Sequence, residues 1–201
     1  MPNLRAYESS VSQLLVLLAI GLAVVWPLFR LSAHNRGAPR IVAFVDFVAM
    51  AFTLQVVLWP MRISGQWSIA RLIALDWMLC AWSLIIAGCI AMGTVAPAVR
   101  YHPARSVKVK HVLHTNARRG LWMFIALLLS MVGPLIAILL NPESPGAQEI
   151  FQWSPIAAAW WMSTHTLDQP EVSEWLRLSI ITVVGFVGWF GLLLQAKSQE
   201  Y

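Results

Sequence analysis

Five long apolar stretches dominate the pattern of hydrophobic and polar positions along this chain. They cover residues 11–29, 41–59, 72–99, 121–140 and 178–196, and the only charged side chains inside them are Asp46 and Asp76. About 20 apolar residues at a rise of 1.5 Å per residue span a bilayer as a helix. Alternation with a period of two is absent, so the stretches predict helices and not strands. Gly133-Pro134 in the fourth stretch predicts a kink.

The composition favours a membrane protein. Of the 201 residues, 59% are hydrophobic and 11% are charged, whereas soluble domains are about 45–50% apolar and about 25% charged. The same numbers exclude a disordered chain, and two cysteines exclude a disulfide scaffold. The sequence therefore predicts an all-α polytopic integral membrane bundle of five transmembrane helices that forms a single domain over residues 1–201. Because Glu8 accompanies Arg5 in the leader, we interpret the first stretch as a retained anchor.

The distribution of basic residues predicts the orientation of the bundle. The loops after the first and third stretches hold nine lysines and arginines, and the loops after the second and fourth hold two. Basic residues in short loops favour the cytoplasmic side, so we expect the N-terminus outside and the C-terminus in the cytoplasm. The net charge of +5 is then a topology signal, with the lipid bilayer as partner and no nucleic acid.

Residues 141–175 form the one long external loop. Within it, Ser154 and Pro155 are typical of an N-cap and a first helical position. We expect a short interfacial helix over about 155–162, lying on the outer surface, although the sequence leaves open whether it lies flat or dips back into the bilayer. Its tryptophans would anchor it at the interface or form a platform for a partner; they are Trp153, Trp160 and Trp161.

Polar side chains inside the spans are candidates for function, because a charge inside a membrane is expensive. The predicted topology places Asp46 and Asp76 in opposite leaflets, so they cannot pair. Each could reach a basic group at its own interface, since Arg40 lies near Asp46 and Arg71 near Asp76. Alternatively they could serve a proton or ion relay, with Gln55 as a further polar group.

The sequence predicts no cofactor, no metal site and no catalytic residue. A haem in a membrane bundle needs ligands on the helices, whereas we place all five histidines in loops: His34, His102, His111, His114 and His165. Cys80 and Cys89 are nine residues apart, on opposite faces of a helix, and cannot hold one ion.

Small residues form two rows that would allow close helix contact. One row lies on the third stretch (Ser83, Ala87 and Ala91) and the other on the fifth (Gly185, Gly188 and Gly191). Such rows serve either packing inside a bundle or docking to another subunit.

Residues 14–142 resemble a bacterial family of small integral membrane proteins whose domain has no assigned function. The likeness rests on the turn Phe29–Arg40, the stretch from Asp46 to Thr53, the exit Leu58-Trp59-Pro60 with Gly65-Gln66-Trp67, and the end Leu140-Asn141-Pro142. The resemblance implies a helical membrane fold in a bacterial inner (plasma) membrane and no activity.

Three functions remain open at this point. The first is a non-catalytic integral membrane subunit, an accessory or assembly protein of a larger membrane complex, with membrane protein partners. The second is a small transporter or channel component that uses Asp46 or Asp76. The third is a redox membrane enzyme subunit that borrows its cofactor from a partner.

Overall fold

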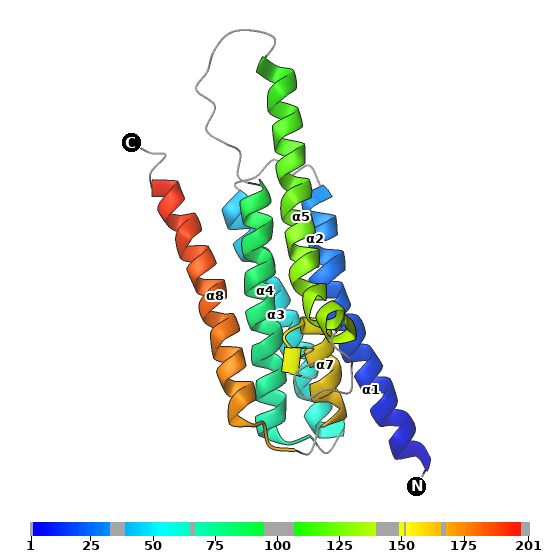
Figure 1. The fold of residues 1–201 in the computed structure, drawn as a ribbon. Coiled ribbons are helices and arrows are strands. Elements are labelled where there is room, and N and C mark those ends of the chain that lie inside the picture. Colours follow the sequence, from blue (N-terminus) through cyan, green and yellow to red (C-terminus); the bar gives the residue numbers. More distant parts are fainter. Residues whose placement is uncertain are drawn as a thin grey trace.

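The computed structural model describes residues 2–32, 39–64, 67–94, 107–139, 149–150, 152–165 and 168–197. These residues form helices and no strand. The elements in chain order are α1 (Pro2–Ile20), η1 (Gly21–Val25), α2 (Trp26–Ser32), α3 (Pro39–Ser64), α4 (Ile69–Thr94), α5 (Val107–Leu139), α7 (Pro155–Thr164) and α8 (Val172–Lys197). α1 begins and α8 ends at opposite ends of the bundle (Figure 1).

Five helical segments are long and apolar enough to cross a membrane, which confirms the predicted all-α class and the number of candidate spans. They are Ser10–Ser32, Ile41–Pro60, Ile69–Thr94, Asn116–Ile136 and Val172–Leu194. α4 ends at Thr94, and residues 95–99 of the third predicted stretch lie outside the described residues. The fifth begins six residues before its predicted start, which brings Glu174 and Arg177 into the helix.

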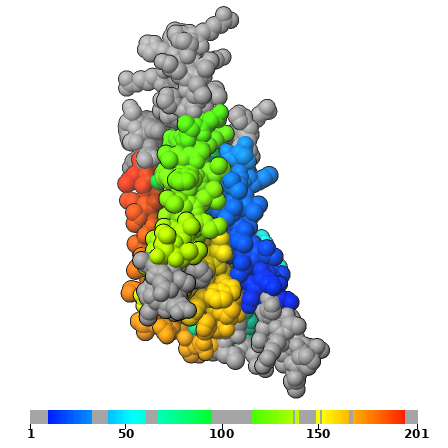
Figure 2. All heavy atoms as spheres, turned by 45° about the vertical axis from the view of Figure 1, so that its right-hand side comes forward, coloured from blue at the N-terminus to red at the C-terminus, as the bar shows by residue number. Residues whose placement is uncertain are grey.

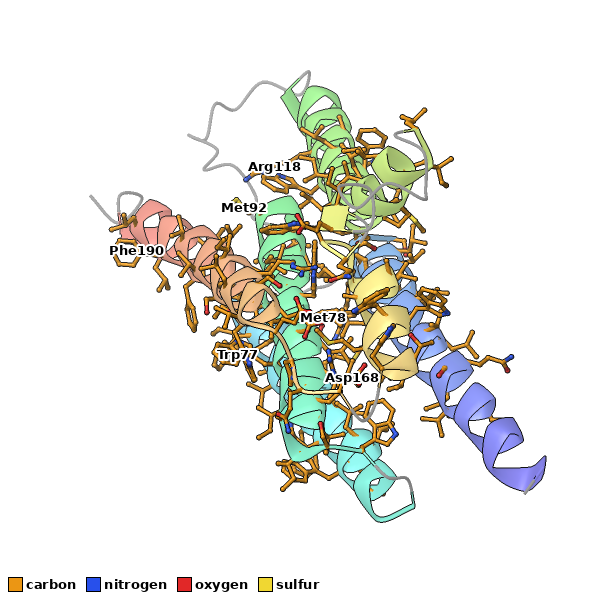
Figure 3. All side chains as sticks on the ribbon, turned by 60° about the horizontal axis from the view of Figure 1, so that its bottom comes forward. Trp77, Met78, Met92, Arg118, Asp168 and Phe190 are labelled. Atoms are coloured by element: carbon orange, nitrogen blue, oxygen red, sulfur yellow. The ribbon has the colours of Figure 1, made fainter. Side chains whose placement is uncertain are left out.

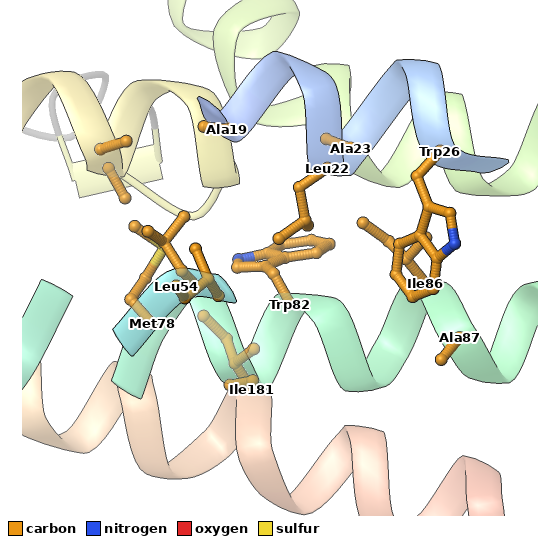
Figure 4. Close-up of a cluster of buried hydrophobic side chains, with 14 of the residues drawn as sticks. Ala19, Leu22, Ala23, Trp26, Leu54, Met78, Trp82, Ile86, Ala87 and Ile181 are labelled. Atoms are coloured by element: carbon orange, nitrogen blue, oxygen red, sulfur yellow. The ribbon is translucent and has the colours of Figure 1, made fainter. Parts of the chain in front are cut away.

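α4 is the central helix, and the other spans surround it (Figure 1). Within its span 72% is buried, against 17% for α3, 17% for α5 and 22% for α8. α3 and α8 both pack chiefly on α4. In the core, Trp82 of α4 lies beneath Leu22 of η1, and Trp26 of α2 lies against Ile86 (Figure 4). The four outer spans therefore turn broad apolar faces away from the chain.

The first span contains a short π-helix that the sequence pattern did not predict. η1 covers Gly21–Val25, and the N–H of Trp26 donates to the carbonyl of Gly21. Pro27 follows directly and is fully buried. A proline has no N–H and crowds the carbonyl four residues before it, so the wider π turn accommodates Pro27 without breaking the span.

The row Ser83, Ala87 and Ala91 packs inside the bundle, because all three side chains are completely buried. Gly93 extends this close contact at the end of α4. A Cβ at Gly93 would lie 2.7 Å from Leu31 Cδ2 and 3.2 Å from Trp122 Cβ. Helices α2 and α5 thus approach α4 so closely at Gly93 that an added carbon would have to displace Leu31 and crowd Trp122.

Replacing Gly93 with alanine is expected to destabilise the bundle by about 1–3 kcal/mol through overpacking. The midpoint of thermal unfolding in detergent, followed by tryptophan fluorescence, measures this loss. Gly120→Ala is the matched control, since nothing lies within 4 Å of a Cβ there, and alanine is the better helix former. Equal losses in the two variants would contradict the proposed close contact.

α7 packs into the bundle, which corrects the expectation of a helix lying on the outer surface. It begins at Pro155 after Ser154, as predicted, but its main contacts are with α1, then α4 and α5. Figure 2 shows α7 beside α1 and α5 on one face of the molecule. The structure buries Ala157, Ala158 and Ala159. These small side chains let α7 sit close to its neighbours.

The two ends of α7 lie at different depths. Ser154 Oγ donates to the carbonyl of Ser130 at 2.6 Å, and Ser130 is six residues, about 9 Å along the axis, from the end of its span. Ser12 Oγ donates to the carbonyl of Ser163 at 3.3 Å, and Ser12 is only two residues from the start of its span. The start of α7 therefore lies at the depth of the spans, beside Ser130. The helix then runs toward the end of the bundle where α1 begins.

Candidate functional site

A buried ion pair joins α4 to α8 at the end of the bundle where α1 begins. Nη1 of Arg71 donates to Oε1 and Oε2 of Glu174 at 2.9 and 2.8 Å. The same guanidinium donates from Nε to the carbonyl of Asp168 at 3.3 Å and from Nη2 to that of Gln169 at 3.4 Å. Arg71 is 2% exposed and Glu174 is 6% exposed. We call this part of the molecule the Arg71 end.

Local sequence explains how Glu174 comes to face Arg71. Glu174 lies in the first turn of α8, where an acidic group is favoured by the helix dipole. Its Oε2 also accepts the backbone N–H of Glu171 at 3.1 Å, so one carboxylate caps α8 and pairs with Arg71. The pair therefore fixes the start of α4, the segment 168–171 and the start of α8 together.

A small pocket lies next to this pair, between α4, α7 and α8. Met78, Ala158, Met162, Leu178 and Ile181 supply apolar walls, with Trp161 beside them; the polar lining is Gln152, Glu174 and Arg177. Arg177 Nη1 donates to Oε1 of Gln152, and Glu174 is held by Arg71. The bond between Arg177 and Gln152 joins the segment before α7 to α8.

The second cluster surrounds Asp76 and draws its side chains from α3 and α4. Nε2 of Gln55 donates to Oδ1 and Oδ2 of Asp76 at 2.7 and 2.8 Å. Nε1 of Trp59 donates to Oε1 of Gln55 at 2.6 Å, and Cys80 Sγ lies 3.7 Å from Oδ1 of Asp76. A carboxylate at membrane depth costs about 2.5–3.5 kcal/mol in insertion measurements, so the hydrogen bonds offset part of that cost.

The prediction that Asp76 pairs with Arg71 is wrong, because Arg71 forms its ion pair with Glu174. Asp76 is seven residues into α4, and Gln55 from α3 is its partner. Asp46 does meet a basic group, but this is Arg30 of α2. Oδ2 of Asp46 is buried without a hydrogen-bond partner.

The two aspartates are far apart, as expected. Gln55, which bonds Asp76, is nine residues from Asp46 on α3, or about 13 Å along the axis. They form two separate sites, one at each end of the bundle. The Arg30–Asp46 pair is 26% and 13% exposed, and it ties α2 to α3.

The histidines were placed in loops, and this is wrong for two of them. His111 and His114 lie on α5, which begins at Val107, before the candidate span that starts at Asn116. Their side chains are not described, and His34 and His102 lie outside the described residues. His165 follows α7, where its ring stacks on Trp161 with centroids 4.1 Å apart.

The other candidates divide between the interior and the surface. Trp153 and Trp160 are 38% and 47% exposed. On α8, a Cβ at Gly185 would lie 3.0 Å from Leu84 Cδ2, so this glycine packs on α4. At Gly188 and Gly191 nothing lies within 4 Å of such a Cβ. The glycine row therefore has one inward member and two outward members.

Sequence reasoning missed the residues that pair most closely. Glu174 and Arg177 were placed outside the fifth span, and Arg30 was counted only for topology. A signal was present for one pair, because Arg71 and Glu174 both fall on the predicted external side. Nothing in the spacing pairs Gln55 with Asp76, since they lie on different helices.

No protein-family model matches this chain, and neither a curated protein nor a solved structure is detectably similar to it. The resemblance of residues 14–142 to a bacterial membrane family therefore stays a prediction.

Proposed function

We propose that this chain is a non-catalytic integral membrane subunit, an accessory or assembly protein that docks sideways into a larger membrane complex. The proposal includes location in a bacterial inner (plasma) membrane, with the Arg71 end and the N-terminus outside. The opposite end, which carries the basic loops, would face the cytoplasm.

The outward glycines of α8 are the observation that carries this proposal. Val184, Val187, Gly188 and Gly191 follow one face of the helix, which we call the α8 glycine face. A Cβ at either glycine would meet nothing of this chain, and the two valines are more than half exposed. A glycine that faces lipid lowers helix propensity and gains no packing contact. A glycine at a contact between helices allows their backbones to approach closely.

The arrangement of charges supports the same proposal. Among the described residues, Arg30 pairs with Asp46 and Arg71 pairs with Glu174. Both pairs hold helices of this chain together, so these charges have a structural role. The surfaces left for contact with other proteins are then the lateral faces of the helices and the segment around α7.

Replacing Gly188 and Gly191 together with leucine is expected to release the chain from its assembly. The leucines block close approach on the α8 glycine face, and a Cβ at either position has no atom of this chain within 4 Å, so the midpoint of thermal unfolding should stay the same. Native mass measurement after extraction from its own membrane in mild detergent reports the assembly.

The matched control is Gly120→Leu, which adds the same side chain at an open position on α5. It should leave the assembly intact. A wild-type chain that emerges as a monodisperse monomer would refute the proposal. Retention of the assembly by the double leucine variant would refute the role of the α8 glycine face.

A small transporter or channel component is the second candidate, because Asp76 lies within a span and is partnered by Gln55. In that case Asp76→Asn would abolish proton or ion flux in vesicles at unchanged expression. Equal flux in the two proteins would remove this candidate.

A further inference from the structure

One stripe of the central helix reaches the lateral surface. Ile73, Asp76, Trp77 and Cys80 lie at positions i, i+3, i+4 and i+7 of α4, which is one face of a helix; we call them the Asp76 stripe. Ile73 is 42% and Trp77 39% exposed, although α4 is mostly buried elsewhere. Figure 3 shows Trp77 and the buried Met78 on different sides of α4.

The stripe lies at membrane depth and ends where α8 closes over α4. Asp76 is seven residues from the start of its span, or about 10 Å along the axis. Further along, Nε1 of Trp189 donates to the carbonyl of Leu84 at 2.9 Å, and Gly185 packs on the Leu84 side chain. α8 also contacts the stripe itself, because Nε1 of Trp77 donates to Oγ1 of Thr182 at 2.8 Å. The opening is therefore limited to the exposed parts of Ile73 and Trp77 in the half of α4 that carries Asp76.

The hydrogen bonds around Asp76 use both of its side-chain oxygens as acceptors. The indole N–H of Trp59 only donates, so its bond to Oε1 of Gln55 fixes the amide with Nε2 toward Asp76. Both oxygens of Asp76 then accept from Gln55. The ion pairs found in the described part of the chain use Asp46 and Glu174 instead. An acidic side chain outside those ion pairs thus lies on a partly exposed lateral face.

We propose that the Asp76 stripe docks a transmembrane helix of another protein that carries one lysine or arginine at the depth of Asp76. This inference rests on the proposed subunit function and names the chemistry of the partner. Charge complementarity favours a basic partner for Asp76, because charged side chains inside a membrane are paired with one another. Trp77 and Ile73 supply the apolar contact around the charge.

A second copy of this chain does not fit the stripe. A two-fold contact between two copies brings the same patch of each copy together. Such a contact would enclose both Asp76 side chains in one small interface with no basic partner from either stripe, and like charges repel in a medium of low dielectric constant. The occupant is therefore a different chain with a basic side chain.

The test uses the purified protein in vesicles of phosphatidylcholine and phosphatidylglycerol, which carry no primary amine. The probe is a synthetic single-span leucine-alanine helix with one lysine seven residues from its outer end. The same helix with leucine in place of lysine is the reference. Energy transfer between labels on the protein and on the probe measures association. We expect the lysine helix to bind about tenfold more tightly than the leucine helix.

Two aspartate variants form a matched pair for this measurement. Asp76→Asn should remove the preference for the lysine helix. Asp46→Asn makes the same chemical change at a carboxylate already paired with Arg30 and should keep the preference. Asp76→Lys, paired with a probe that carries aspartate, should restore association, so the inference stays testable if the asparagine variant folds poorly.

Equal binding of the two probes to the wild-type protein would overturn the inference, as would a preference that survives in Asp76→Asn. Loss of the preference when phosphatidylethanolamine is added would also overturn it, because a lipid ammonium would then occupy the stripe. The proposed function fails separately: if the chain is a monomer in its own membrane but still selects the lysine helix, only the subunit role is lost.

Discussion

Replacing Arg71 with methionine is expected to destabilise the folded chain by about 3–5 kcal/mol, the loss typical when one partner of a buried ion pair is removed. Methionine keeps much of the side-chain volume but leaves Glu174 buried without its cation. It also removes the donors to the carbonyls of Asp168 and Gln169. The start of α8 should loosen from α4, and the midpoint of thermal unfolding in detergent should fall steeply.

The double variant Arg71→Met with Glu174→Met provides the decisive comparison. An apolar pair of similar volume often replaces a buried ion pair at little loss, so the double variant should regain much of the lost stability. Such a positive coupling is what a double-mutant cycle detects for residues in contact. Additive losses from the two single variants would show that Arg71 and Glu174 act independently.

The spans could be predicted from sequence because their signal is local. A run of apolar residues such as 121–140 is sufficient to indicate a helix that crosses a membrane, and α5 contains residues 121–139 of it. Gly133-Pro134 was expected to produce a kink, and the last turns of α5 bend away from its axis (Figure 1). The N-cap at Ser154 was predicted for the same reason, since capping depends on neighbouring residues.

The contacts between helices could not be predicted in this way. Hydropathy identifies the spans, but not α4 as the one the others surround, because all five stretches are similarly apolar. Gln55 meets Asp76 only after α3 and α4 have packed in one register. The pairing of Arg71 with Glu174 likewise joins residues 103 positions apart.

The position of α7 shows how composition can indicate the wrong environment. Tryptophans at 153, 160 and 161 suggested an interfacial helix. The alanines between them decide the packing instead, since Ala158 and Ala159 are buried against the bundle while Trp160 stays exposed. A small face on a short helix can therefore outweigh an aromatic face when larger helices offer a matching surface.

Replacing Ala159 with leucine is accordingly expected to push α7 away from α1 and α4. Ala159 is completely buried, and added carbons in a packed site cost about 1–3 kcal/mol. Because α7 is short, the helix should leave its site rather than distort the spans. A cysteine placed by Ser163→Cys, which is 4% exposed in the wild type, should then react with a membrane-impermeant maleimide.

The same cysteine reports on the control, Trp160→Leu, at a position on α7 that is 47% exposed. That substitution should leave Ser163→Cys protected, since it adds nothing to the buried side of the helix. Release of α7 would also break the bond from Ser154 to the carbonyl of Ser130, which holds the deep end of the helix. Protection of the cysteine in the Ala159→Leu variant would mean that the alanine face does not determine where α7 lies.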